Sequence, residues 1–322
     1  MYLLLRGAFR DLSTKGSACA PDLAGYLASF LTVALGLCPG VCLELWLIGA
    51  VGPAPARAQA QFASGVHLVE VYATVTDRDG HPIRGLTKQD FTVYENEQPQ
   101  ELSVFTAGEV GLSVAVALDH SFSMAGERLD MMKRATETFL DALAPTDRAM
   151  LIGIGSTVEV LAPLSTDRAA QHQAVHTLDA FGSTSLRDAL VTALDRIEPA
   201  PGRRALVLLS DGVDRYSQAS EADVLDRARH GDVLAYPIAL AKRAPPLFVD
   251  LAIATGGHSL QLTDPRRLGD TLVTIAHELR QQYLLGYAPR RASAGRPEWR
   301  GLRVTVARAG ATVRARPGYW TK

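Results

Sequence analysis

Two short runs that are almost entirely apolar, at 112–118 (LSVAVAL, with one serine) and 205–209 (ALVLL), constrain the fold most. A strand that is apolar toward both of its faces has to be covered on both, as a parallel strand of an α/β sheet is. Helical patterns alternate with such strands along the middle of the chain. We expect further strands at 149–154, 158–161, 233–240 and 259–262, and helices at 127–143, 168–178, 186–197, 221–229, 247–255 and 265–280. This alternation predicts a doubly wound α/β domain with a mostly parallel sheet.

The regions on either side of this domain have strand patterns without helices. Strands are expected at 66–76, 91–94 and 102–105, with polar turns at 77–80 and 95–100, and again at 283–287, 302–306 and 311–314. A helix-free stretch of about forty residues is too short to fold well alone. We therefore expect one small all-β sandwich made of residues 61–110 and 283–322, with the α/β domain, residues 111–282, inserted into it.

Residues 1–60 have the pattern of an export segment. The 21 residues from Leu23 to Leu43 carry no charge, basic residues precede them, and small-residue sequences of the A-x-A type follow. Pro39 and Gly40 would break a single buried helix at this place. Both a cleaved signal peptide and a retained membrane anchor fit the pattern. The protein is therefore expected to be exported, either periplasmic, secreted or anchored to the membrane facing outward.

Charge and cysteine content exclude several classes of function. The chain has 33 Lys and Arg against 34 Asp and Glu, a formal net charge of −1, which provides no basic surface for nucleic acid. All three cysteines lie in the first 42 residues. The chain from residue 43 onward therefore has no disulfide, no thiol nucleophile and no cysteine metal ligand.

Polar residues follow the two apolar strands. The first strand ends in DHSFS (119–123), the second in SDG (210–212), and a loop that enters a helix between them reads GSTSL (182–186). In open α/β sheets, ligands bind beyond the carboxyl ends of the strands. Two carboxylates and three hydroxyls at this edge are hard oxygen ligands, which suit Mg²⁺, Mn²⁺ or Ca²⁺ better than zinc.

These residues resemble the metal-ion-dependent adhesion site (MIDAS) of the von Willebrand factor A (VWFA) domain, Asp-x-Ser-x-Ser … Thr … Asp. The corresponding residues here are Asp119, Ser121, Ser123, Thr184 and Asp211. The resemblance implies that both serines bind the metal directly, that the threonine joins them in the high-affinity state, and that both aspartates act mainly through bound water. It also implies that an acidic residue of a partner protein completes the coordination, and that movement of the helix at 265–280 tunes the approach of the threonine.

A wider resemblance covers roughly four-fifths of the chain, residues 66–319. This span is similar to the VWFA-related domain described from acidobacterial proteins. The similar segments are VTDRDGHPIRGLTKQDFTVYENEQPQ (75–100), TGG (255–257), LRQQYLLGY (279–287) and RARPGYW (314–320). The chain departs from the family pattern at Ser183, where a glycine often precedes the threonine.

Ordinary explanations exist for single residues of the motif. Ser183 or Thr184 is suited to cap a helix and Ser123 to open a turn, but capping does not explain both aspartates. No Gly-x-Ser-x-Gly elbow is present in the sequence. His277-Glu278 lacks the second histidine of a zinc protease, and 153–155 (GIG) lacks the third glycine of a dinucleotide loop. The sequence therefore predicts a protein that is not an enzyme.

Other conspicuous residues are expected to be structural. The aromatic residues near the two chain ends are expected to fill the sandwich core: Phe91, Tyr94, Phe105, Tyr283, Tyr287, Tyr319 and Trp320. The arginine pairs at 203–204 and 290–291 are expected to be solvated loop charges.

The sequence as a whole predicts an exported VWFA-domain protein. Its expected function is to bind a protein partner through Mg²⁺, or Mn²⁺ or Ca²⁺, in cell adhesion or as a scaffold, with the partner supplying a carboxylate. Two alternatives stay open. One is a metal-independent structural or assembly module of the cell envelope, and the other is a metal-dependent hydrolase.

Overall fold

The computed structural model describes residues 68–108, 110–290 and 295–321. These residues belong to one compact unit, Ala63–Lys322. The expected export or anchor segment, residues 1–60, lies outside the described residues. In the part that is described, no helix has the length and apolar character needed to cross a membrane.

A six-stranded sheet forms the centre of the α/β region, in the order β10-β9-β8-β5-β6-β7. Five of its strands are parallel to one another, and β7 is antiparallel to β6 at one edge. The strands are β5 (Leu112–Asp119), β6 (Arg148–Ile154), β7 (Val158–Ser165), β8 (Arg203–Ser210), β9 (Val233–Ala239) and β10 (Leu260–Gln261). All eight residues of β5 are buried. The prediction of a doubly wound, mostly parallel sheet is confirmed.

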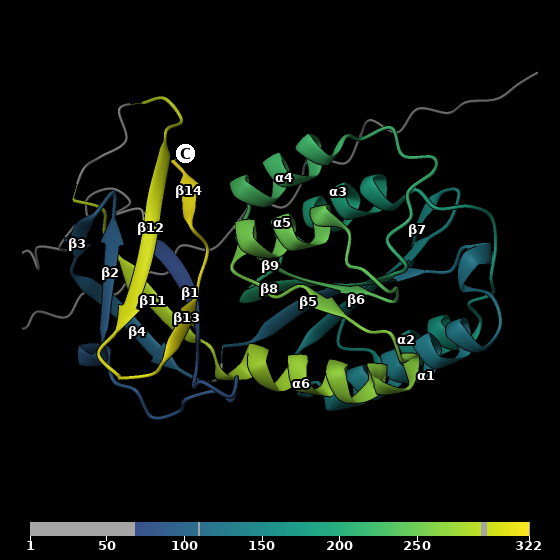
Figure 1. Cartoon of the computed structure of the whole chain (residues 1–322), viewed down its shortest axis with the longest axis horizontal. Helices are drawn as coiled ribbons and strands as arrows, with labels where there is room; N and C mark the ends of the chain where they lie inside the picture. Colours follow the sequence, from purple (N-terminus) through teal and green to yellow (C-terminus); the bar gives the residue numbers. More distant parts are fainter. Residues whose placement is uncertain (1–67, 109, 291–294, 322) are drawn as a thin grey trace, which may run out of the picture. The chain divides into compact units, whose positions relative to one another are not determined.

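Helices cover both faces of this sheet (Figure 1). They are α1 (Glu127–Ala142), α2 (Arg168–His176), α3 (Leu186–Ile197), α4 (Glu221–His230), α5 (Pro246–Thr255) and α6 (Leu268–Gln281). One apolar core lies beneath α1, α2 and α6, and a second lies beneath α3, α4 and α5. In β5, Val114, Val116 and Leu118 face the first core, while Ala115 and Ala117 face the second. Successive side chains of a strand point to opposite faces, so this one strand holds both layers together.

Two antiparallel four-stranded sheets form the second region, and each takes strands from both ends of the chain. The first has the order β13-β1-β11-β4 and the second β14-β12-β2-β3. Their bounds are β1 (Val69–Thr76), β2 (Phe91–Glu95), β3 (Gln98–Gln100), β4 (Leu102–Ala107), β11 (Tyr283–Tyr287), β12 (Trp299–Val306), β13 (Thr312–Arg314) and β14 (Gly318–Trp320). One apolar core is shared by both sheets. This agrees with the predicted sandwich, while the exact domain boundaries at residues 60, 110 and 282 stay predictions.

Two strands of the sandwich are missing from the sequence prediction. Strand β3 occupies half of the stretch that was expected to be a polar turn, because a two-residue turn at Asn96 and Glu97 suffices to reverse the chain. Both residues have left-handed backbones, with φ of 47° and 63°, which is the geometry of a tight hairpin. Strand β14 is only three residues long and follows Pro317. Short and polar edge strands carry little apolar periodicity, so the pattern does not reveal them.

The expectation for the aromatic residues is mostly right. Phe91, Phe105 and Tyr283 form a cluster with ring centroids 4.9–6.0 Å apart. Tyr94 is an exception, because it is half-buried and lies under the guanidinium of Arg303, with 4.0 Å from the guanidinium carbon to the ring centroid. Trp320 is also outside the core. It packs against Trp299 and stacks on His230 of α4, with ring centroids 5.8 and 5.3 Å away.

The expectation that Arg203 is a solvated loop charge is wrong. Arg203 is the first residue of β8 and is fully buried. Its guanidinium carbon lies 4.9 Å from the ring centroid of Tyr72 in β1, and its Nη2 donates to the carbonyl oxygen of Gln282 at 3.3 Å. Burial lowers the pKa of Arg203. The sandwich covers this end of the strand, and such long-range packing leaves no trace in the local sequence.

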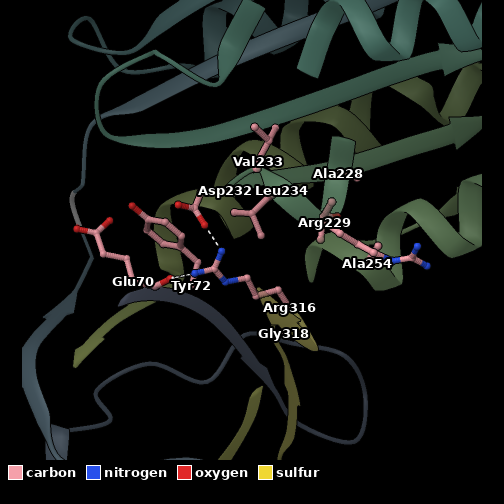
Figure 2. Close-up of a pocket in the computed structure, with 12 residues that line it drawn as sticks. Glu70, Tyr72, Ala228, Arg229, Asp232, Val233, Leu234, Ala254, Arg316 and Gly318 are labelled. Atoms are coloured by element: carbon pink, nitrogen blue, oxygen red, sulfur yellow. Dashed lines mark hydrogen bonds and ion pairs between the residues drawn. The ribbon is translucent and has the colours of Figure 1, made fainter. Parts of the chain in front are cut away.

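A small pocket lies beside this contact between the two regions (Figure 2). Arg316 of the sandwich forms an ion pair there with Asp232, which lies between α4 and β9, and its Nη2 donates to the carbonyl oxygen of Glu70 at 2.7 Å. Arg204 reaches the same carboxylate at 3.6 Å. The expectation that Arg204 is a solvated loop charge is therefore also wrong. These contacts fasten the sandwich to the amino ends of β8 and β9. The carboxyl ends of the same strands lie at the opposite side of the sheet.

Candidate metal site

Four of the five predicted ligands lie at or just after the carboxyl ends of the neighbouring strands β5 and β8, and the fifth, Thr184, lies in the loop between α2 and α3. Asp119 is the last residue of β5, Asp211 directly follows β8, and Thr184 precedes α3 by two residues. Asp119, Ser121 and Thr184 are 0%, 2% and 3% exposed, whereas Ser123 is exposed and Asp211 is half-buried. Because parallel strands end at the same edge of a sheet, the residues after β5 and β8 belong to one edge, and a hydrogen bond from the amide of Arg215 joins Thr184 to it. The site is thus buried at its base and open to solvent at its rim.

Backbone hydrogen bonds join the loops that carry these residues. The amide of Phe122 donates to the carbonyl of Gly182 at 3.0 Å, and the amide of Phe181 donates to the carbonyl of His120 at 2.8 Å. The carbonyl of Thr184 accepts from the amide of Arg215 at 3.0 Å, in the loop that follows Asp211. The three loops are therefore fixed to one another rather than merely adjacent.

Gly182 is required at the centre of this arrangement. Its φ is +70°, a left-handed backbone that favours glycine, and a Cβ there would lie 2.4 Å from Oγ of Ser156. That hydroxyl instead accepts the amide of Ser183 at 2.8 Å. Glycine at this position lets the loop before Thr184 pass close to the end of β6.

Asp119 is a buried carboxylate held by neutral donors. Its Oδ1 accepts the amide of Ser121 at 3.0 Å, and its Oδ2 accepts the hydroxyl of Ser210 at 2.6 Å. Burial raises the pKa of Asp119, the hydrogen bonds from Ser210 and Ser121 lower it, and the neighbouring charge of Asp211 raises it again. The net shift is upward. Among the described residues, neither aspartate takes part in an ion pair with a lysine, arginine or histidine.

The hydroxyl groups of Ser121 and Ser123 lie next to each other beside Asp119. Oγ of Ser121 and Oγ of Ser123 are 3.1 Å apart. Thr184 is linked to the set through its backbone, as described above. Ser210, the residue before Asp211, was not predicted as part of the site, and its hydroxyl also accepts the amide of Gly212 at 2.9 Å. No motif position marks Ser210, and only the pairing of β5 with β8 brings it to Asp119.

His120 has a structural role in this edge. It is 8% exposed, and its Nδ1 lies 2.9 Å from the carbonyl oxygen of Asp179. Its ring packs against β6, since a Cβ on Gly153 or Gly155 would approach Nε2 to 3.1 or 3.3 Å. The two glycines that resemble part of a dinucleotide loop therefore make room for this ring.

A second group of possible metal ligands lies in the turn after β1. Single ligand atoms of Asp77, Asp79 and His81 lie within 4.8 Å of one another. The sequence analysis treated this stretch only as a turn. The structure supports that interpretation, because Oδ1 of Asp77 accepts the amides of Asp79 and His81, both at 2.9 Å. Those hydrogen bonds, led by the one from His81, lower the pKa of Asp77.

Comparison with known families agrees with this fold and motif. Residues 114–213 match the model of the von Willebrand factor type A domain, a span that contains all five predicted ligands. The chain therefore contains a von Willebrand factor type A domain. No curated protein matches the sequence.

Several solved structures are similar to this chain at low sequence identity. The PilB minor pilin from Streptococcus sanguinis is 14% identical, with 54% of this chain and 62% of the pilin covered, at a TM-score of 0.47. A von Willebrand factor type A protein from Catenulispora acidiphila is 18% identical, with 72% and 73% covered, also at 0.47. The vWF domain of the type V pili tip protein Mfa5 from Porphyromonas gingivalis is 22% identical, with 33% and 39% covered, at 0.31.

Proposed function

We propose that this protein binds a divalent metal ion through Asp119, Ser121, Ser123, Thr184 and Asp211, and that the bound metal captures a protein partner without catalysis. The observation that carries the proposal is the buried Asp119 carboxylate, which has a second carboxylate beside it and, among the residues that the structure describes, no cationic side chain as its partner. Burying an unpaired charge is unfavourable, so such a group calls for a cation from outside the protein.

The chemistry of the donor set selects the cation. Carboxylate and hydroxyl oxygens favour hard ions, so Mg²⁺ or Mn²⁺, and with a looser fit Ca²⁺, are the candidates. In the proposed arrangement the hydroxyls of Ser121 and Ser123 bind the ion, Thr184 joins them, and the two aspartates act mainly through water. The metal supplies positive charge at the rim of the site, where a carboxylate of the partner completes its coordination.

The residues around the site support binding rather than turnover. The nearest candidate for a general base, His120, has its Nδ1 at the carbonyl of Asp179 and its ring packed on β6. An adhesive or scaffold-like role outside the cytoplasm follows if residues 1–60 direct export as their sequence predicts.

Direct metal binding tests this proposal. Mn²⁺ is titrated into the full chain and the free ion is followed by electron paramagnetic resonance. The wild type is expected to bind one ion, and Asp119→Ala is expected to weaken binding at least about tenfold, because the site loses one of its two charges. Asp179→Ala is the matched control, since Asp179 is an exposed carboxylate on the adjoining loop. Equal binding by all three proteins would contradict the proposal.

A further inference from the structure

The loops around the candidate metal site carry the most exposed aromatic side chains among the described residues. Phe181, Phe122 and Tyr216 are 68%, 66% and 62% exposed. Of the other large apolar residues described, only Ile253 on α5 is similarly exposed, at 61%. Each of the three aromatic residues lies within five positions of a proposed ligand. Exposed apolar groups concentrated at one place mark an interaction surface rather than a chance distribution.

Phe122 and Phe181 form a defined pair. Their ring centroids are 6.4 Å apart with a tilt of 54°. The two backbone hydrogen bonds between their loops, from Phe122 to Gly182 and from Phe181 to His120, hold the rings beside each other. Neither ring belongs to any of the three apolar cores. The fold therefore presents this aromatic pair to solvent in a fixed position.

A groove of about 270 Å³ adjoins the site. It reaches Gly212, the residue after Asp211, and its lining is mixed, with Pro245 beside the charged residues Arg187, Asp214 and Glu221. Arg187 and Asp214 form an ion pair there at 3.1 Å. The exposed apolar groups next to the ligands are therefore the aromatic side chains of the loops.

The charge of these loops indicates what kind of partner they accept. The segments 119–126, 154–157, 179–185 and 211–217 contain four aspartates and one arginine, with Asp119 buried and Asp214 paired with Arg187. These loops therefore have no cluster of basic residues, which is what binds phosphate-rich membranes and nucleic acid. A partner that offers one carboxylate to the bound cation, and apolar side chains to the exposed aromatic rings, fits this surface.

We propose that the partner presents a protein segment in which an aspartate or glutamate has a large apolar residue within one or two positions. The carboxylate completes the metal coordination, and the apolar side chain packs on Phe122 and Phe181. This inference rests on the proposed metal-dependent function and adds the sequence type of the partner. Buried aromatic contacts at the centre of an interface are the ones that carry most binding energy.

Phage-displayed random peptides, panned against the immobilised full chain with Mg²⁺ and eluted with EDTA, test the inference. The enriched peptides are expected to contain an acidic residue next to an aromatic or large aliphatic one. A synthetic consensus peptide should bind Phe181→Ser at least about fivefold more weakly than wild type. Ile253→Ser, which removes an equally exposed apolar side chain far from the site in sequence, should bind it like the wild type.

Several results would overturn the inference. They are enrichment of acidic peptides without apolar neighbours, enrichment of no peptide, and equal losses in both variants. Binding to phosphatidylcholine–phosphatidylserine vesicles that is lost in Phe181→Ser would assign the aromatic pair to a membrane instead. Mn²⁺ titration of the wild type separates the two proposals, because metal binding needs no peptide. If Mn²⁺ binds but the apolar preference is absent, only the present inference fails.

Discussion

Two buried carboxylates, Glu95 in the sandwich and Asp119 in the von Willebrand factor type A domain, have opposite surroundings. Oε1 of Glu95 accepts Nη1 of Arg300 at 3.1 Å, and Oε2 accepts the hydroxyls of Tyr287 and Tyr319 at 2.6 and 2.8 Å. Asp119 accepts one hydroxyl and one amide and lies beside another carboxylate.

The difference separates a structural charge from a functional one. In the sandwich a buried guanidinium matches the charge of Glu95. Glu95 lies in β2, and its donors lie in the C-terminal strands β11, β12 and β14, so the network joins the two chain ends. Burial, and then the hydrogen bond to Glu95, raise the pKa of Tyr319 to about 12, which keeps this phenol a donor at neutral pH. At Asp119 the described part of the chain provides hydrogen bonds but no positive charge. That deficit is what a bound cation would fill.

The largest expected effect on stability comes from removing the carboxylate of Glu95, which pairs with Arg300. Glu95→Ala removes one of the two carboxylates that Arg300 contacts, the other being Glu298 at 2.7 Å, and also the acceptor of the Tyr287 and Tyr319 hydroxyls. It should lower the free energy of unfolding by about 2–4 kcal/mol, as measured by urea denaturation. Glu97→Ala is the control, since Glu97 forms an exposed ion pair with Arg303 and should change little. A small effect of Glu95→Ala would mean that the sandwich network is not structural.

An intermediate effect is expected at Asp214, a carboxylate of the same sheet edge that does have a cationic partner. Burial opposes its charge, but hydrogen bonds from Ser217 and Arg187 outweigh burial and lower the pKa of Asp214 overall. A lowered pKa in the folded state adds stability above the unfolded-state pKa, and this stability is lost as pH falls through the folded-state pKa.

Asp214→Asn should therefore reduce the free energy of unfolding by about 1–2 kcal/mol near neutral pH. The difference from the wild type should shrink as pH falls below the usual range of an aspartate. Urea denaturation at a series of pH values checks this expectation. A difference that stays constant down to low pH would show that the charge of Asp214 is not what stabilises the loop.

The smallest effect, and one of opposite sign, is expected at Asp119 without metal. Its pKa is raised in the folded state, so its ionised form opposes folding, and the opposition grows as pH rises through the folded-state pKa. In EDTA near neutral pH, Asp119→Asn should leave the free energy of unfolding unchanged or raise it by less than about 1.5 kcal/mol. A loss of several kcal/mol would make Asp119 a structural residue like Glu95.

Local sequence patterns account for most of the fold but only part of the site. The apolar run of β5 requires coverage on both faces, and strands alternate with helices after it, so the doubly wound sheet is predictable from the sequence. The motif marks the five proposed ligands. Ser210 and the buried Arg203 are not predictable in this way. Their roles arise because β8 pairs with β5 along its length, which brings Ser210 to Asp119 at one end, while Arg203 meets the sandwich at the other end. Pairing partners are not encoded in local periodicity.

The exposed aromatic pair was also missed, for a different reason. A phenylalanine between two serines reads as an ordinary loop residue, and Phe181 follows the expected helix at 168–178 without any pattern of its own. Only the fold shows that both rings are exposed and lie beside each other near the ligands.

Thermal unfolding of the full chain is the most direct test of whether Asp119 and Asp211 help to bind a divalent metal. The wild type and an Asp119→Asn, Asp211→Asn double variant are measured in EDTA, Mg²⁺, Mn²⁺ and Ca²⁺. A metal at a hundred times its dissociation constant stabilises the native state by about 2.7 kcal/mol, which raises the melting temperature measurably. The account predicts this rise with Mg²⁺ or Mn²⁺ for the wild type and none for the variant. No rise at millimolar metal, or the same rise in both proteins, would contradict it.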